Sequence, residues 1–508
     1  MNSTLSRLAS GGAASWATRA AWLLFAVLTG LLALYWAKFA YNAYLAATFP
    51  AQLEYSEGII WQQARLIPGP RMYGDLQTYP FLVFHYPPFY HLIVHGLAVL
   101  GVPWLMAGRL VSIVSTVALA ALIAAFTNES LANTDTARRN RLAAALTAGL
   151  LLVTLGPIQF WGDTMRMDML AVMLEILGMY LGLCSIRRPE LIYPSAAVFV
   201  LAVYTKQTVI LGAAATFAAF LIHTPARALR AAAFAVLLGG IIFAVLTLAT
   251  GGGFPRHIFF YNVSPFSWRA VAEKIAETRI IPGYPVYLAI VLGAAAVLGF
   301  RLWTRPLRHV PPAQIMIFVY FILATANLLS LGKAGGWTNY LIPWMCSWAM
   351  LIGLAIAEIG EAAQRRGQPL IVLGLVAALL AQALVAPKFG DAKMVDARFR
   401  REYAQLVDLV ARAKKPVLSD DMVVLMLAGK EVPWEPAVIT VLSERGVFDE
   451  GKAIRMIEAH DFSYVVREKF NFRGERGTPA VDAAIAKAYP AERTLARLRV
   501  LSPGGPDR

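Results

Sequence analysis

Charged side chains are scarce in this chain of 508 residues, and their scarcity excludes a soluble protein. Asp, Glu, Lys and Arg together make up 15% of the residues, whereas 58% are hydrophobic. Soluble domains contain about a quarter charged and roughly half apolar residues. The composition therefore indicates a polytopic α-helical membrane protein.

Cysteine is almost absent as well, and so are the common short motifs of enzymes. The two cysteines, Cys184 and Cys346, both fall in predicted spans, so they give no basis for a disulfide framework. The sequence has no nucleophile elbow, no glycine-rich phosphate loop and no zinc-ligand spacing. The net charge of +15 could suggest a nucleic-acid partner, but much of it comes from arginines in short loops between apolar runs, where membrane orientation explains them. We therefore expect no nucleic-acid partner.

Eleven apolar stretches approach the length of a membrane span, which is roughly 20 helical residues across ~30 Å of hydrocarbon. The first lacks an obvious small-residue cleavage site and is predicted to be retained. The two that flank "YTKQT" are short and fit a locally thin region. The predicted spans are residues 21–45, 104–126, 142–160, 168–186, 191–204, 208–223, 230–250, 284–300, 313–331, 338–357 and 369–387.

The stretch "HYPPFYHLIVHGLAVLG", residues 85–101, decides the orientation of the chain. Between Pro88 and Pro103 there is room for about 14 helical residues, or ~21 Å, which is too short to span. His91 and His95 have the spacing of metal ligands, but a polar stripe on an amphipathic segment in the interface is the better interpretation. We therefore predict that this stretch lies at the outer surface.

With that stretch outside, the loop arginines obey the rule that positive charge concentrates in cytoplasmic loops. The short outer loops then hold only Arg166, Lys206 and Lys333, and the N-terminus lies inside. Twelve arginines are predicted inside, namely Arg138, Arg139, Arg141, Arg187, Arg188, Arg227, Arg230, Arg301, Arg305, Arg308, Arg365 and Arg366.

The predicted organisation has two parts. Residues 1–387 form a transmembrane domain, with outer loops at 46–103 and 251–283. Residues 388–508 form a small α/β domain outside, with strands at "PVLSD" and "SYVVRE" and helices at "MVVLMLAG", "PAVITVLSERG" and "EGKAIRMIEAH". A tail of about 120 residues suffices for its own core.

Two acidic clusters are expected on the outer face. Glu54 and Glu57 in "LEYSEGIIWQQARL" are three residues apart, so one of them could act as a general base, although the spacing alone favours capping of the following helix. In "WGDTMRMDM", Asp163 and Asp168 flank Arg166 and could clamp a divalent cation or orient an acceptor; an ordinary helix N-terminus is the alternative. Glu175 lies deeper, as a functional acid or as a protonated packing residue.

Five further residues on the same face are candidate phosphate contacts: Arg109, Lys206, Arg256, His257 and Lys333. Each of them taken singly is also typical of an interfacial anchor whose charge reaches the headgroups. Their convergence on one face with four carboxylates favours a joint site.

The order of several short motifs resembles that of the GT-C membrane glycosyltransferases. The motifs are "SEG", "RMYGD", "YPPFY", "AGRLVS", "RMDMLAV" and "TKQT", within residues 50–215, and they are similar to the aminoarabinose transferase and protein O-mannosyltransferase branch. The segment "VLSDDMVVLMLAGK" resembles the C-terminal domains of bacterial members.

This resemblance implies a GT-C fold and an inverting transfer of a sugar from a polyprenyl-phosphate donor to a glycan, lipid or protein acceptor. The enzyme would lie in the plasma (bacterial inner) membrane, with its active site and C-terminal domain on the periplasmic face. Ser56 stands where many relatives have Asp, so the base is Glu57 or Glu54; Asp168 matches the acid of the second loop, accompanied by Arg166. Lys206 matches a lysine of "TKQT"-like turns, and assigning it the donor phosphate is a further step. No cofactor is certain, and a divalent metal held by Glu57 and Asp168 stays open.

Two other functions remain possible on the sequence alone. A lipid-linked sugar flippase or transporter would fit the many spans and Glu175. A transporter, however, should have polar residues along a path through the membrane, and apart from Glu175 and Asn327 the spans contain few polar residues of this kind. A non-catalytic assembly partner would present the tail domain to a polysaccharide machine.

Overall fold

The computed structural model describes residues 2–132, 134–262, 264–386, 397–468 and 476–504. Every predicted span falls on helical structure. The bundle contains α1 (Asn2–Ala47), α4 (Trp104–Ser130), α5 (Arg138–Leu151), α7 (Asp168–Cys184), α8 (Ile192–Thr205), α9 (Leu211–His223), α10 (Pro225–Ala249), α14 (Pro285–Thr304), α15 (Pro312–Asn327), α16 (Ile342–Arg365) and α17 (Pro369–Val385). The short helices between them are α2 (Glu57–Leu66), α3 (Phe89–Val99), α6 (Gly156–Trp161), α11 (Gly253–Pro255), α12 (Trp268–Glu277) and α13 (Ile280–Gly283).

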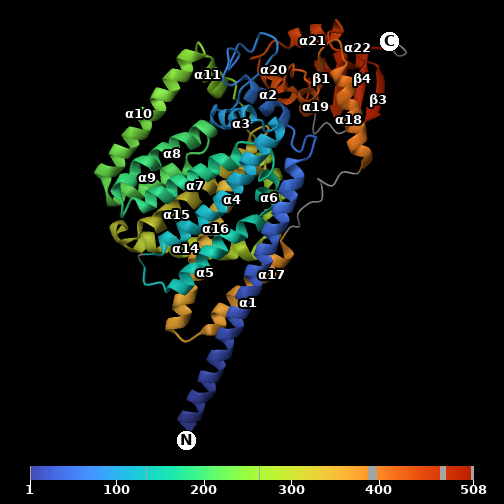
Figure 1. The fold of residues 1–508 in the computed structure, drawn as a ribbon. Helices are drawn as coiled ribbons and strands as arrows, with labels where there is room; N and C mark the ends of the chain where they lie inside the picture. Colours follow the sequence, from blue (N-terminus) through green and yellow to red (C-terminus); the bar gives the residue numbers. More distant parts are fainter. Residues whose placement is uncertain (1, 133, 263, 387–396, 469–475, 505–508) are drawn as a thin grey trace.

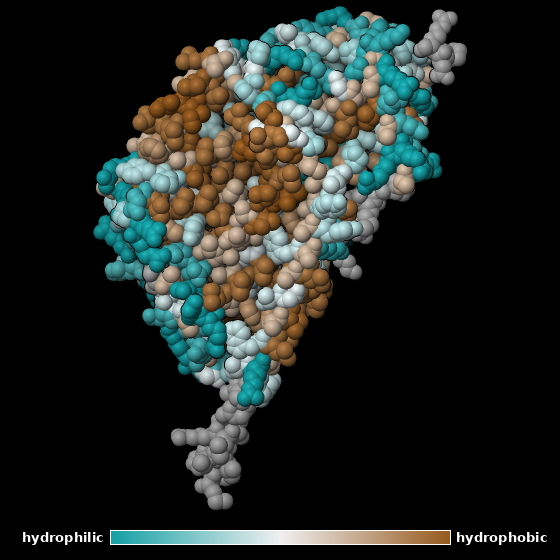
Figure 2. All heavy atoms as spheres, viewed as in Figure 1, coloured by the Kyte–Doolittle hydropathy of each residue, from teal (hydrophilic) through white to brown (hydrophobic). Residues whose placement is uncertain are grey.

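Six of the described helical segments are long and apolar enough to cross a membrane: Trp16–Ala47, Trp104–Ser130, Pro225–Ala249, Pro285–Thr304, Pro312–Gly332 and Thr338–Arg365. Apolar side chains cover the middle of the bundle, and hydrophilic side chains gather at both of its ends and on the C-terminal part (Figure 2). The protein is therefore an integral membrane protein. The total of eleven spans remains a prediction, because several of the other helices are shorter than a bilayer requires.

The predicted span 142–160 is not one helix. α5 ends at Leu151, a short 3-10 turn follows, and α6 begins after Leu155, whose backbone is extended (φ −90°, ψ 118°). Pro157 accounts for the break, since it lacks the N–H that a continuous helix would donate to the carbonyl four residues earlier, and its ring would clash with that carbonyl. The break redirects the chain toward the turn that carries Arg166.

The helix in residues 85–101 is α3, whose 11 residues are too few to cross a bilayer, as predicted. The expectation of an exposed polar stripe is wrong for His91, which is fully buried and lies 3.2 Å (Nε2 to Oε1) from Gln63 of α2. His95 contacts the Ala64 carbonyl at 3.0 Å. Both histidines hold α3 against α2, each through one ring nitrogen.

The C-terminal part contains a four-stranded sheet with helices beside it. Its sheet has the order β1-β2-β4-β3, in which β1 and β2 are parallel and the other pairs antiparallel, with Val417 opposite Tyr464 and Val465 opposite Leu501. The boundary predicted at residue 387 lies outside the described residues. The elements are α18 (Ala397–Ala411), β1 (Val417–Ser419), α19 (Met422–Leu427), α20 (Pro436–Glu444), α21 (Glu450–Glu458), β2 (Tyr464–Glu468), α22 (Pro479–Ala488), β3 (Ala491–Leu495) and β4 (Leu498–Ser502).

This unit packs on α2 at one end of the bundle (Figure 1). A Cβ placed on Gly58 would lie 2.4 Å from the backbone carbon of Met422, so only glycine permits the close approach of α2 and α19. Gln62 of α2 exchanges two hydrogen bonds with the backbone of Val432. The N–H of Phe81 in the first loop donates to the Pro433 carbonyl at 2.8 Å. The first loop and the C-terminal unit therefore form one continuous surface.

Candidate active site

Polar side chains from four separate segments meet where the first loop covers the bundle. They come from the start of α2, the turn before α7, the turn between α8 and α9, and the segment before α16. A cavity of about 310 Å³ opens beside them and is lined by Asp168, Glu175, Lys206, Asn339 and Tyr340, together with Val172, Thr208, Val209, Leu211, Asn327 and Pro343. The two acidic clusters of the sequence thus belong to one site.

Glu57 is fully buried against Arg109 of α4. Its Oε1 accepts from Arg109 Nε (2.9 Å) and the Met165 backbone N–H (2.8 Å), and its Oε2 accepts from Arg109 Nη2 (2.7 Å) and the Leu53 N–H (2.7 Å). A carboxylate has about four acceptor positions, and all four are occupied here. Glu57 therefore has no lone pair with which to take a proton from an acceptor.

Arg109 is saturated in the same way, so the expectation that it contacts phosphate is wrong. Besides Glu57, its guanidinium donates to the carbonyls of Ala46 (2.8 Å), Phe49 (2.7 Å) and Ala51 (2.7 Å). These bonds use all five N–H donors of an arginine. Glu57 and Arg109 together fix the path of the chain from α1 into the first loop.

Glu54, in contrast, is partly open, with 16% of its side chain exposed. Its Oε2 accepts from Ser56 N (2.9 Å) and Ser56 Oγ (2.5 Å) and lies 3.6 Å from Arg166 Nη1. Among the described residues, no group donates to its Oε1. Glu54 is therefore a partly exposed carboxylate beside an arginine, with one oxygen that accepts no hydrogen bond from the described residues.

Asp168 holds two cations at the mouth of the cavity. Its Oδ1 accepts from Lys206 Nζ (2.5 Å) and Asn339 Nδ2 (2.9 Å), and its Oδ2 accepts from Arg166 Nε (3.2 Å). Burial lowers the pKa of Lys206, but the Asp168 carboxylate together with Tyr340 and Tyr86 more than offsets burial, so the pKa lies above its usual value. Lys206 is therefore an ammonium ion at neutral pH, and it lies 4.8 Å from the ring centre of Tyr340.

Arg166 connects the two acidic groups. Besides Asp168, its guanidinium donates to Ser56 Oγ and to the hydroxyl of Tyr86 at 3.3 Å. It also lies 5.3 Å from the ring centre of Trp161. Because Arg166 spans from Ser56 to Asp168, the partly open Glu54 and the Lys206 ammonium belong to the same polar cluster.

The remaining predicted phosphate contacts are not brought into this cluster. His257 is buried, accepts from the Phe84 N–H (3.1 Å) and lies 2.7 Å from the Gly74 carbonyl, so it fixes the first loop. Burial lowers the pKa of His257 to about 4, so the side chain is neutral. Arg256 donates to the Gly251 carbonyl. Lys333 is exposed, and no bond joins its side chain to the cluster within the described chain.

Two acids in this region are buried. Asp163 lies in the same turn as Arg166 and is 1% exposed. Glu175 accepts from the Gly212 N–H (2.7 Å) and the Tyr320 hydroxyl (3.0 Å), so it links α7 with α9 and α15 while lining the cavity.

Sequence reasoning missed Asn339, Tyr340 and Tyr86 as members of the site. Tyr86 lies within the quoted motif "YPPFY", which was a usable signal. Asn339 carries no comparable signal, because it is 171 positions from the aspartate that it contacts.

Comparisons with known proteins agree with this architecture. A sequence model described as "Glycosyltransferase family 87" matches residues 84–330, which include Arg166, Asp168 and Lys206. The match covers slightly less than half of the chain, which is similar to that family over these residues. No curated protein gave a match.

The fold of the chain is similar to that of two solved enzymes. One is ArnT from Cupriavidus metallidurans bound to undecaprenyl phosphate, with 15% sequence identity, a TM-score of 0.56, and coverage of 93% of this chain and 98% of that one. The other is the archaeal oligosaccharyltransferase AglB from Archaeoglobus fulgidus in complex with an inhibitory peptide and a dolichol-phosphate, with 12% identity, a TM-score of 0.51, and coverage of 90% and 72%.

Proposed function

We propose that this glycosyltransferase moves a sugar from a polyprenyl-phosphate donor to an acceptor hydroxyl, with inversion at the anomeric carbon. The observation that carries the proposal is the open carboxylate oxygen of Glu54, beside two cations that Asp168 holds at the mouth of a cavity. The two enzymes of similar fold contain undecaprenyl phosphate and dolichol-phosphate, which supports a donor of this class.

In this mechanism, Glu54 is the general base. It takes the proton of the acceptor hydroxyl as the acceptor oxygen forms a bond to C1 of the sugar. The bond between C1 and the phosphate oxygen breaks on the opposite side of the ring, so a single displacement inverts the configuration. The leaving polyprenyl phosphate gains negative charge, which Lys206 and Arg166 stabilise.

Asp168 acts as a positioning residue in this scheme. Its two oxygens hold the ammonium of Lys206 and the guanidinium of Arg166 at fixed places before the donor arrives. Cations fixed in advance lower the energy of a developing anion without having to reorganise during the reaction. Asn339 completes the hydrogen bonding of the same carboxylate.

A divalent metal held by Glu57 and Asp168 does not fit these residues. Glu57 accepts four hydrogen bonds, and Asp168 accepts from two cations and an amide. A metal would have to displace those donors from both acids. A further structure of the Archaeoglobus fulgidus enzyme is a complex with zinc and sulfate, but the described residues of this chain contain no group of three or more His, Cys, Asp or Glu able to hold a metal.

We also propose that the active site and the C-terminal unit face the periplasm, with the arginine-rich loops in the cytoplasm. The proposal depends on the distribution of arginines along the sequence. A reporter fused after Arg508 should be active only outside the cytoplasm. Activity restricted to the cytosol would contradict it.

The donor can be identified by mass spectrometry of lipid-linked sugars in cells with and without this protein. A polyprenyl-phosphate sugar should accumulate in the absence of the protein and return to its normal level when the wild-type chain is restored. The Lys206→Met variant should not restore it. If lipid-linked sugars are unchanged but their distribution between the two leaflets shifts, the protein is a flippase.

A further inference from the structure

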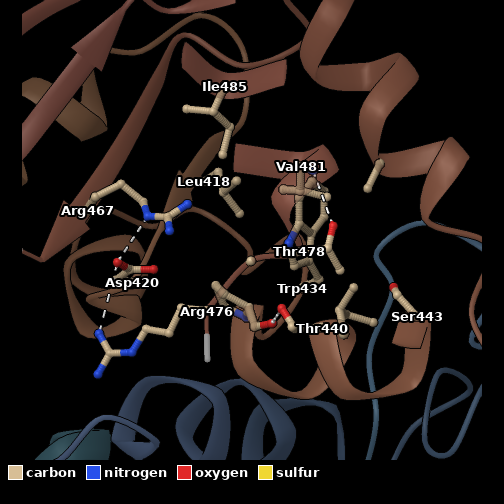
Figure 3. Close-up of a pocket in the computed structure, with 14 residues that line it drawn as sticks. Leu418, Asp420, Trp434, Thr440, Ser443, Arg467, Arg476, Thr478, Val481 and Ile485 are labelled. Carbon is tan, nitrogen blue, oxygen red and sulfur yellow. Dashed lines mark hydrogen bonds and ion pairs between the residues drawn. The ribbon is translucent and has the colours of Figure 1, made fainter. Parts of the chain in front are cut away.

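Two partly buried arginines of the C-terminal unit are balanced by carboxylates. Figure 3 shows Arg467 and Arg476 on either side of Asp420, whose Oδ2 lies 3.3 Å from Arg467 Nε and 4.0 Å from Arg476 Nη1. Arg467 also pairs with Asp482 (Nη1 to Oδ1, 3.1 Å), and Arg476 pairs with Glu468 (Nη1 to Oε2, 2.7 Å). The charge of both guanidinium groups is therefore neutralised within the unit.

Three exposed arginines of the same unit have no carboxylate partner among the described residues, namely Arg400 and Arg401 of α18 and Arg497 in the turn between β3 and β4. The one acid in the first two turns of α18, Glu402, is already used. Its Oε1 accepts from Arg398 Nε (2.7 Å), and its Oε2 accepts from the Ala496 N–H (3.1 Å). The surface formed by the three arginines, called the basic surface below, therefore carries positive charge that the described protein does not offset.

Two of these arginines lie on a stack of aromatic rings. Phe399 of α18 stacks on Phe49, with ring centres 6.4 Å apart and an angle of 9° between the planes. The guanidinium of Arg400 lies 5.8 Å from the ring centre of Phe49, and that of Arg497 lies 5.6 Å from the ring centre of Phe399. Arg401 directly follows Arg400 and is exposed. Segments far apart in the sequence thus bring the three positive charges to one place.

The turn that carries Arg497 has an unfavourable backbone. Ala496 and Arg497 connect β3 to β4, and both have a left-handed φ, of 48° and 64°. Two-residue hairpin turns of this kind favour Asn and Gly, because a larger side chain crowds the left-handed backbone. The Glu402 carboxylate holds the turn against α18 through the Ala496 N–H. The fold therefore keeps an arginine beside α18 at a position that favours glycine.

The basic surface lies at the level where the bundle leaves the membrane. Phe49, beneath Arg400, is two residues beyond α1, which is long and apolar enough to span a bilayer. Tyr41 and Tyr44 in the last turns of α1 are exposed, as is typical of the aromatic belt at the depth of the lipid headgroups. Figure 1 places α18 beside this end of α1, and hydrophilic side chains cover α18 in Figure 2. An exposed cation at this level faces lipid headgroups.

We propose that the basic surface binds the phosphate groups of anionic phospholipids, and that this contact holds the C-terminal unit on the membrane beside the active site. Clusters of arginine next to a span attract anionic lipids. A guanidinium group also matches the geometry of a phosphate, to which it can donate two parallel hydrogen bonds. The inference does not depend on the proposed reaction, because none of the three arginines belongs to the polar cluster around Asp168.

The test uses the full chain in nanodiscs of phosphatidylcholine that contain a phosphatidylglycerol with a photoactivatable diazirine on its headgroup. Mass spectrometry after illumination should locate lipid adducts at residues 397–403 and at the turn that contains Arg497. The triple variant Arg400→Gln, Arg401→Gln, Arg497→Gln should lower the adduct yield about tenfold or more, since each arginine near an anionic surface contributes about fivefold in affinity.

Two further triple variants serve as controls. Replacing the same three arginines with lysine keeps the charge, so the labelling should remain within about threefold of the wild type. Arg412→Gln, Arg455→Gln, Arg499→Gln removes equal charge from arginines of the same unit that face carboxylates, and its labelling should also remain.

The inference is overturned if a phosphatidylcholine with the same diazirine labels the basic surface equally well, or if the two glutamine variants lose labelling to the same extent. An unlabelled basic surface would also overturn it and would leave an acidic protein as the occupant. If the glutamine variant of the basic surface unfolds below the wild-type temperature, the lysine variant decides, because loss of its labelling contradicts binding through charge. None of these outcomes changes the role proposed for Glu54, which is measured by sugar transfer.

Discussion

Replacing Glu57 with glutamine is expected to destabilise the fold instead of selectively stopping the reaction. The amide would place two N–H donors where Oε2 now accepts from Arg109 Nη2 and the Leu53 N–H, so both bonds are lost. The positive charge of Arg109 would remain buried among backbone carbonyls without its counter-ion. Removing one member of a buried ion pair costs about 3–5 kcal/mol, and this range includes the lost charged hydrogen bond of about 1.5–3 kcal/mol.

The assay is thermal unfolding of the purified full chain in lipid nanodiscs, beside the yield of folded protein. Glu57→Gln should unfold several degrees below the wild type or fail to accumulate. Glu54→Gln is the matched control; its amide can still accept from Ser56, so we expect a loss of about 1 kcal/mol or less. Adding Arg109→Gln to Glu57→Gln should recover part of the loss, because the unpaired charge is removed.

One result would refute this reasoning. If Glu57→Gln unfolds at the wild-type temperature and transfer is abolished, Glu57 acts in the reaction and its hydrogen bonds to Arg109 are secondary. The role of Glu54 as the base would then be in doubt as well.

Four further outcomes are expected. Lys206→Met should raise KM for the lipid donor about tenfold or more, because a charged hydrogen bond to the donor phosphate is lost. KM is measured by titrating the donor, and an unchanged KM would contradict the contact between Lys206 and the phosphate. Burial raises the pKa of Asp421 to about 7 in the folded chain, whereas in the unfolded chain an aspartate has a pKa near ~4. The protonated Asp421 therefore stabilises the folded state fully below pH ~4, and this contribution is lost as the pH rises to about 7. Asp421→Asn should flatten that profile and stabilise the chain at pH 8 by up to about 4 kcal/mol, seen in unfolding at pH 5 and pH 8; equal profiles contradict this assignment. Gly58→Ala should cost about 1–3 kcal/mol because its Cβ meets Met422, whereas Gly96→Ala, with nothing within 4 Å, should not lower stability. Chelation with EDTA should leave transfer unchanged, because Glu57 and Asp168 already accept from protein donors. Loss of activity that Mg²⁺ or Mn²⁺ restores would contradict this.

The helices were predictable because their signal is local. Runs of apolar residues located the long helices of the bundle, and apolar periodicity located β1, β2 and the helices between them in the C-terminal unit. The break between α5 and α6 was missed, since Pro157 lies inside an otherwise apolar run. The final helix and hairpin of the tail were not predicted either, because the exposed strand β3 has little apolar alternation.

The membership of the site was predictable in part. The order of the motifs gave Glu54, Arg166, Asp168 and Lys206, and these residues do lie in one polar cluster. The sequence could not tell which of Glu57 and Glu54 is the base. The two differ in how many acceptor positions of the carboxylate are left free by hydrogen-bond donors of the folded protein. That number depends on partners that are distant in sequence, such as an arginine 52 positions away. The same limit applies to Asn339.

The most direct test of the central claim is the rate of sugar transfer by Glu54→Gln in nanodiscs, with the natural lipid donor present above its KM and donor binding measured in parallel. The account predicts that kcat falls by at least about a hundredfold, the usual contribution of a general base, while donor affinity and unfolding temperature stay near those of the wild type. A variant that binds the donor normally and transfers the sugar at the wild-type rate would contradict the account.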